Sequence, residues 1–203
     1  YESFDHFLDF FSSRNRKNLK KERRKIAEQD LEIKRFTGNQ ISLDVVDDFY
    51  SFYVDTHLRR SGHSGYLNKD FFEEITQTIA DNILIILAYK NGRAVAGSFF
   101  FYDQNNLYGR YWGASNDFDA LHFECCYYQG IDFCIEKNIK RFDPGVQGEH
   151  KIKRGFEPTF TFSSHWIENH DFSLAISDFL LREDKYIKDY HQDASTLLPF
   201  KNI

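Results

Sequence analysis

The chain has 203 residues, enough for one domain with a buried core or for one domain with a helical arm. Hydrophobic residues make up 41% of it, charged residues 28%, and the formal net charge is -5, which excludes a disordered chain and attraction to nucleic acid through overall charge. The longest apolar run, residues 83–89, has the length of a strand, so neither a membrane span nor a signal peptide is expected.

The first thirty residues predict a helical arm. Ser3 can cap a short helix whose apolar residues recur at helical spacing. In residues 14–25, eight of twelve residues are basic and only Glu22 is acidic. The simpler interpretation is a basic helix face in solvent. The other is an arm that binds phosphates of tRNA, a nucleotide or a lipid head group, with Arg23 and Arg24 as contacts.

The middle of the chain predicts helices followed by a meander of strands. A strand is expected over residues 31–36, a helix over residues 45–56 and a second helix that begins at Asn68. Two β-prone runs meet at Asn91-Gly92, the strongest short signal of a hairpin. The turn “DQNN” leads to a third strand, “LYGRYWG”, so we expect three antiparallel strands in succession.

A long helix is predicted over about residues 119–138. It is apolar on most sides, which is typical of a helix buried against a sheet. It carries all three cysteines, Cys125, Cys126 and Cys134, which are spaced like helix residues and not like a disulfide framework. This favours a reducing compartment and a cytoplasmic location. A cysteine nucleophile is not favoured in so apolar a helix, and no zinc-ligand spacing is present, so no metal site is expected.

The last third predicts a short strand over residues 139–143, a charged stretch, a strand over 159–166 and an amphipathic helix over 172–190 that closes the domain. A helical crossover makes the strands on either side of it parallel, and a cleft opens where parallel strands diverge. We therefore expect an α/β fold with a mixed sheet. “LYGRYWG” and “FDPGVQGEH” are expected to line its cleft.

This order of elements is similar to the GNAT acyltransferase fold. The segments “LYGRYWGAS”, “LHFECCYYQGIDFCIEKNIKRFDPGVQGEHKIKRGFEP” and “SSHWI” resemble the FemAB-like family of bacterial GNAT-related proteins, which is associated with peptidoglycan biosynthesis or recognition. The resemblance implies a GNAT-like domain over residues 31–203 after a helical basic arm over residues 1–30. It also implies that the chain is the carboxyl-terminal part of a longer protein, in keeping with the lack of methionine and the start at Tyr1.

The resemblance implies an acyl- or aminoacyltransferase in which an amine attacks the acyl group directly, with no tightly bound cofactor. The donor is acetyl-CoA or aminoacyl-tRNA, and the acceptor is the amine of a small molecule or a peptide. CoA-binding members carry a Gly-rich pyrophosphate loop before the long helix, where this chain reads “GASNDFDA”, so the donor stays open. tRNA could bind through the basic arm, and the oligomeric state is open.

Acyl transfer to an amine needs a base, preorganised donors for the oxyanion and, for a phosphate-bearing donor, cations. The candidate bases are Glu149, which we favour, then His150 and Asp143. The candidate phosphate contacts are Lys151, Lys153, Arg154, Arg23 and Arg24. The predicted substrate cleft contains Gly109, Arg110, Tyr111, Trp112, Gln147, His122, Glu124 and Tyr128. Gly109 and Gly113 permit a bulge or a close backbone approach in the strand.

Four other interpretations compete with this one. The chain could be a non-catalytic binding module that recognises a peptide, a cell-wall precursor or tRNA, or an interdomain scaffold. The charged stretch could be a solvated surface loop. Arg110 could stack on Tyr111 or Trp112 as part of the fold.

Overall fold

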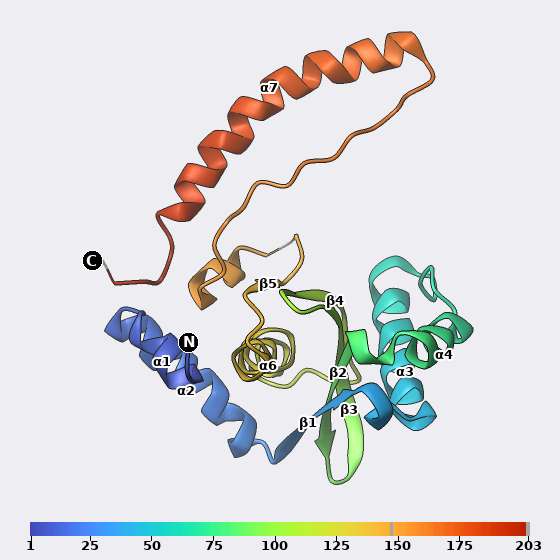
Figure 1. Ribbon diagram of the computed structural model, residues 1–203, viewed down its shortest axis with the longest axis vertical. Coiled ribbons are helices and arrows are strands. Elements are labelled where there is room, and N and C mark those ends of the chain that lie inside the picture. The colour runs from blue at the N-terminus through green and yellow to red at the C-terminus, as the bar shows by residue number, and fades with distance from the viewer. Residues whose placement is uncertain (147, 202–203) are drawn as a thin grey trace. The chain divides into compact units, whose positions relative to one another are not determined.

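The computed structural model describes residues 1–146 and 148–201. They form two compact units, the first of residues 1–146 and the second of the residues that follow. In chain order the first unit contains α1 (Phe4–Asp9), α2 (Ser13–Glu28), β1 (Leu31–Thr37), η1 (Gly38–Gln40), α3 (Leu43–Ser61), α4 (Lys69–Thr78), η2 (Ala80–Asn82), β2 (Ile83–Lys90), β3 (Arg93–Tyr102), β4 (Asn106–Ala114), α5 (Leu121–Phe123), η3 (Glu124–Tyr128), α6 (Gln129–Lys137) and β5 (Arg141–Asp143) (Figure 1).

Local sequence signals begin and end these elements as predicted. The Ser3 side chain accepts a hydrogen bond from the His6 backbone at the start of α1, and Asn68 does the same for Phe71 at the start of α4. Asn91 and Gly92 both have positive φ values, 51° and 75°, which suit a two-residue hairpin turn between β2 and β3. The element η3 is a π-helical turn, so α5, η3 and α6 form one helix over residues 121–137, as the sequence predicted.

The first unit is built on a five-stranded sheet in the order β1-β2-β3-β4-β5. The first three pairings are antiparallel, and β5 pairs with β4 in parallel after the crossover through the 121–137 helix. The predicted mixed sheet is therefore confirmed.

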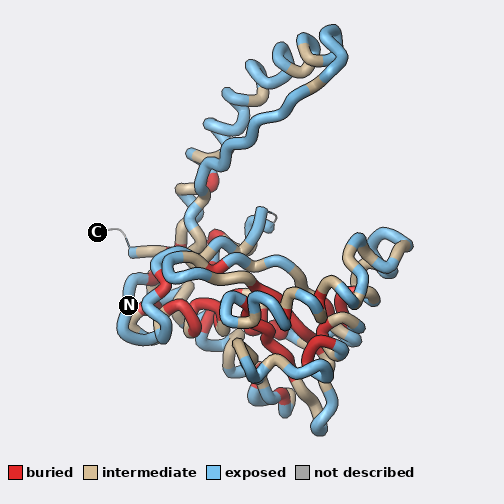
Figure 2. Tube along the Cα trace, turned by 45° about the vertical axis from the view of Figure 1, so that its right-hand side comes forward, coloured by how far each residue is buried: buried red, intermediate tan, exposed pale blue. Residues whose placement is uncertain are grey.

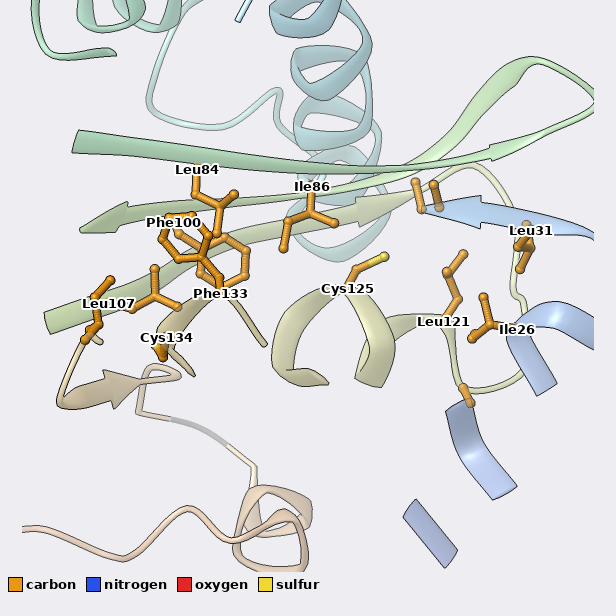
Figure 3. Close-up of a cluster of buried hydrophobic side chains, with 14 residues drawn as sticks. Ile26, Leu31, Leu84, Ile86, Phe100, Leu107, Leu121, Cys125, Phe133 and Cys134 are labelled. Carbon is orange, nitrogen blue, oxygen red and sulfur yellow. The ribbon is translucent and has the colours of Figure 1, made fainter. Parts of the chain in front are cut away.

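Both faces of the sheet are covered by helices. Residues 83–88 of β2 are fully buried, with alternate side chains on opposite faces. One face packs against α3 and α4 in a cluster that includes Phe49, Phe72 and Phe99. The other packs against the 121–137 helix and Ile26 of α2 (Figures 1 and 3). Aromatic rings make up much of the core on the α3 face, where Phe49, Phe72 and Phe99 contact one another.

The second unit contains η4 (Glu149–Arg154) and α7 (His170–Ser195). The strand predicted over residues 159–166 is wrong, because these residues form no regular element and leave Phe162 and Trp166 exposed. A β-prone sequence becomes a strand only where a neighbouring backbone pairs with it, and no described strand does so. The final helix is confirmed, but within this unit most of its residues are exposed, including Phe172 and Leu181 (Figure 2).

Gly113 of β4 lies where α3 crosses the sheet, and the packing leaves no room for a side chain. A Cβ at this position would lie 2.2 Å from the Phe52 carbonyl oxygen and 2.7 Å from Thr56 Oγ1. We expect Gly113→Ala to lower the free energy of unfolding by about 1–3 kcal/mol, measured by denaturant unfolding. Gly109→Ala is the matched control, because its Cβ would have no neighbour closer than 3.5 Å and should change stability by about 1 kcal/mol or less. Equal losses in the two variants would contradict this account of the packing.

Candidate functional site

Strand β4 carries a β-bulge at Arg110. In the pairing with β3, Tyr111 lies opposite Phe99 and Gly109 lies opposite Phe100, so Arg110 has no partner in the register of the described strands. Bulges redirect backbone groups and occur often beside active sites. The exposed guanidinium of Arg110 lies 5.6 Å from the centroid of the Tyr111 ring, so the predicted stacking is also present. A bulge at Arg110 and its stacking on Tyr111 are compatible, because the bulge is a feature of the backbone and the stacking uses the side chain.

The edge of β4 that faces β5 is paired along a third of its length. Residues 106–108 pair with residues 141–143 of β5, and no described strand pairs with this edge beyond Tyr108. Asp143 ends β5 where the two strands part, and its carboxylate accepts a hydrogen bond from the Gly145 backbone at 2.8 Å. The predicted divergence of two parallel strands is thus present. Beyond Tyr108, the backbone groups on that side have no partner strand among the described residues, although the Ala114 carbonyl oxygen accepts a hydrogen bond from Arg59.

His122, predicted as a cleft residue, lies beside Trp112 of β4. Their ring centroids are 5.3 Å apart in an edge-to-face arrangement. Nδ1 of His122 lies 3.4 Å from Cys126 Sγ, and Nε2 lies 3.3 Å from Tyr127 Oη. The sequence analysis named Cys126 but did not favour it as a nucleophile or a metal ligand, and it did not name Tyr127. His122 and Cys126 are four residues apart on a helix, a spacing at which two side chains can meet.

Glu124 and Tyr128 face the amino-terminal helices. Glu124 is 3% exposed and accepts hydrogen bonds from Arg23 of α2 at 3.0 Å and from Gln129 at 2.7 Å. Arg23 also donates to Asp132 at 2.8 Å. Burial disfavours the charged guanidinium of Arg23, but the two carboxylates outweigh it and raise its pKa above the ordinary value. Sequence reasoning missed Gln129 and Asp132, because nothing local indicates which helix they face.

These contacts hold α1 and α2 against the 121–137 helix. The Arg23 guanidinium lies 4.4 Å from the centroid of the Phe4 ring, and the buried Tyr128 hydroxyl donates a hydrogen bond to Glu22. A direct role of Glu124 and Tyr128 in substrate binding, and of Arg23 in phosphate binding, stays a prediction.

The positive charge of α2 is partly neutralised within the first unit. Besides Arg23, four of its cations lie next to carboxylates, in the ion pairs Arg16–Asp9, Lys20–Asp5, Arg24–Glu28 and Lys25–Asp119. Phosphate binding depends on the number of cations that can neutralise phosphates, so these pairs lower the attraction expected from the sequence alone.

The favoured base candidates, Glu149 and His150, begin η4 in the second unit. Glu149 is exposed, and the Tyr190 hydroxyl donates a hydrogen bond to its Oε1 at 3.2 Å. Burial and the charges of Arg154 and Lys151 lower the pKa of His150, so its imidazole is neutral at neutral pH and can accept a proton. Tyr190 was missed by the sequence analysis, because it lies 41 residues after Glu149.

The predicted phosphate contacts of this stretch differ in exposure. Arg154 is buried, and its Nη1 donates a hydrogen bond to the His150 carbonyl oxygen at 2.8 Å. Lys153 is exposed and lines a pocket of about 310 Å³ together with Glu149, His150 and Leu197. The structure thus brings the two favoured bases and one cation together in this unit. Gln147 lies outside the described residues.

The described residues contain no group of three or more His, Cys, Asp or Glu side chains placed to hold a metal ion. Among the helices of the described chain, none has both the length and the apolar character that crossing a membrane requires.

Three comparisons with known proteins place the fold. Residues 1–202 match the model of the FemAB-like family, described as peptidoglycan biosynthesis/recognition. The structure is similar to a possible acetyltransferase of Clostridium difficile 630 (TM-score 0.51, 12% identity, 68% of this chain and 99% of that one). It is also similar to L-PGS of Bacillus licheniformis (TM-score 0.50, 16% identity, 68% of this chain and 44% of that one). No curated protein sequence matches the chain. The predicted GNAT-like fold and family are confirmed, and the predicted transferase class agrees with them.

The pairing of Arg23 with Glu124 yields a stability prediction. Arg23→Ala leaves the buried Glu124 carboxylate without its cation, so we expect the free energy of unfolding to fall by about 3 kcal/mol, the low end for a buried pair, because the guanidinium is partly exposed. Arg24→Ala removes an exposed pair with Glu28 from the same helix and should cost about 0.5 kcal/mol or less. Urea unfolding of both variants measures the difference. A loss in Arg23→Ala no larger than in Arg24→Ala would exclude a stabilising role for the cluster.

Proposed function

The chain belongs to the FemAB-like family, and from this premise we propose that it transfers an acyl or aminoacyl group to an amine that attacks the donor directly. The observation that carries the proposal is strand β4, where the bulge at Arg110 lies next to an edge that β5 leaves unpaired. Such an edge offers backbone N–H groups in fixed positions, as stabilisation of an acyl-transfer oxyanion requires.

The proposed reaction runs along this edge. The donor carbonyl accepts a hydrogen bond from the β4 backbone at the bulge, and the amine nitrogen adds to the carbonyl carbon. The oxyanion that forms is stabilised by the same N–H groups, which need no reorganisation during the reaction. The amine loses its proton to a base and the tetrahedral intermediate collapses. The sulfur of CoA leaves as the thiolate, or the ribose oxygen of tRNA leaves as a hydroxyl with the proton that the base returns.

An acyl-CoA is the donor that we propose first. The ion pairs of α2 lower its capacity to bind the backbone of a tRNA, which favours the smaller donor. The acceptor is proposed to be a primary amine of a small molecule or a peptide. A cytoplasmic location suits either donor, and none of the three cysteines forms a disulfide.

The bulge can be removed with little change elsewhere in the strand. Deletion of Arg110 would place Tyr111 next to Gly109 and restore a regular pairing with β3. We expect this deletion to lower kcat by about 10²–10³-fold, the cost of losing an oxyanion donor. Arg110→Ala keeps the backbone of the bulge and should stay within about threefold of the wild type. The assay follows thiol release from acetyl-CoA with a panel of amino sugars, amino acids and lysine peptides.

The binding step is measured separately by titration calorimetry with acetyl-CoA. Binding and turnover that persist in the Arg110 deletion, with an unchanged unfolding midpoint, would overturn the role of the bulge. Binding without turnover of any amine would favour the binding module over the transferase. No binding would exclude acetyl-CoA and turn the assay to aminoacyl-tRNA.

The pH profile of kcat/KM separates the candidate bases. The base must be unprotonated, so activity falls as the pH drops through its pKa. If His150 is the base, this fall lies below the ordinary range for a histidine, because burial, Arg154 and Lys151 lower its pKa, and only His150→Gln removes the fall. The variant that lacks the base should lose about 10²–10⁴-fold in rate.

Glu149→Gln and Asp143→Asn are the matched variants for the other two bases. Both preserve side-chain shape, and both carboxylates are exposed, so each variant should fold. Full activity in all three variants would exclude these residues as the base and leave the amine to lose its proton to water.

A further inference from the structure

The three cysteines share one helix but lie in different surroundings. Cys125 projects toward the sheet between the apolar side chains of its face, and it is fully buried (Figure 3). Cys134 is also buried, in the same cluster. Burial raises the pKa of Cys134 to about 12 and that of Cys125 well above its ordinary value, so both stay protonated. Cys126 is partly exposed, so of the three it is the thiol that a reagent can reach.

Among the described residues, Cys126 lies within hydrogen-bond range of an imidazole. Its Sγ lies 3.4 Å from His122 Nδ1, one helical turn earlier, and His122 Nε2 lies 3.3 Å from Tyr127 Oη. In the tautomer that donates its Nε2 proton to Tyr127, Nδ1 is an acceptor and can take the thiol proton. The Trp112 ring packs against the imidazole in an edge-to-face arrangement. Thiol, imidazole and phenol thus form a chain of contacts that the transferase proposal does not use.

We propose that Cys126 is a thiol-exchange site that takes up a small disulfide as a mixed disulfide, with His122 as its base. The thiol proton moves to His122 Nδ1, and the thiolate attacks one sulfur of the small disulfide. A new S–S bond forms as the old one breaks, and the departing thiolate receives the proton from His122. One disulfide bond replaces another, so no further oxidant is needed.

The ligand class follows from the surroundings of Cys126. An imidazole at hydrogen-bond distance can take the proton of the thiol. This leaves the thiolate, which is the species that exchanges with disulfides. The partial burial of Cys126, and the ring of Trp112 against its partner His122, favour a small uncharged reagent. The inference rests on these contacts alone and is independent of the proposed acyl transfer.

The test treats the full chain with 2-hydroxyethyl disulfide and follows the adduct by intact-mass and peptide mass spectrometry. We expect one adduct, on Cys126, formed at least about tenfold faster than any on Cys125 or Cys134, which serve as internal controls. Cys126→Ser should abolish the fast adduct, and Cys125→Ser should leave it unchanged. Equal labelling of all three cysteines in the folded chain, or fast labelling that survives Cys126→Ser, would overturn the proposal.

The role of His122 is tested by His122→Gln, which keeps an acceptor but cannot carry the proton. Its labelling rate should fall at least about tenfold, while the unfolding midpoint measured by circular dichroism stays near that of the wild type. Tyr127→Phe is the second variant, in case His122→Gln fails to fold. It removes the acceptor of the Nε2 proton and should slow labelling by a smaller factor. Unchanged rates in the folded variants would show that Cys126 reacts without this chain of contacts.

Discussion

The burial of β2 on both faces is the constraint on which the first unit depends. Residues 83–88 have essentially no exposed surface, so each face of the sheet must be covered by a separate layer. Helices α3 and α4 supply one layer, and the 121–137 helix supplies the other. Since that helix connects β4 to β5 across the second face, covering the face also makes these two strands parallel.

The open edge of β4 is a consequence of this arrangement. β4 pairs with β3 from Leu107 to Ala114 except at the bulge, so β4 does not need β5 to stay extended. β5 ends after three paired residues. The rest of this edge of β4 has no partner strand among the described residues. Rigidity on one side and accessibility on the other suit a strand that positions an acyl donor.

The 121–137 helix serves three purposes on three of its sides. Cys125 and its apolar neighbours pack on the sheet. Glu124 and Asp132 hold α2 through ion pairs with Arg23. His122, which contacts Cys126, lies beside Trp112 of β4. The helix contains a π-helical turn, Glu124–Tyr128, of a kind that occurs often at functional sites. One helix thereby links the core, the amino-terminal helices and the candidate site.

The sequence by itself determined the elements and their order, because caps, turn residues and apolar periodicity act over a few neighbouring residues. Ser3, Asn68 and Asn91-Gly92 begin or turn elements where predicted, and the parallel pairing of β4 and β5 followed from the crossover helix. Only the tertiary structure decided which charges are neutralised. Arg23 appeared as a phosphate contact, but its carboxylate partners lie more than 100 residues away.

In the candidate site too, the sequence determined some features and the tertiary structure decided others. The glycines of “LYGRYWG” indicated a bulge, and the bulge is present one residue after Gly109. Its exact place is set by the register with β3, in which Tyr111 lies opposite Phe99 and Gly109 lies opposite Phe100. The strand predicted over residues 159–166 failed because an extended sequence needs a backbone partner, and pairing is decided by long-range packing. Spacing along the chain identified the residue types of the site, and their neighbours across the fold decided what each can do.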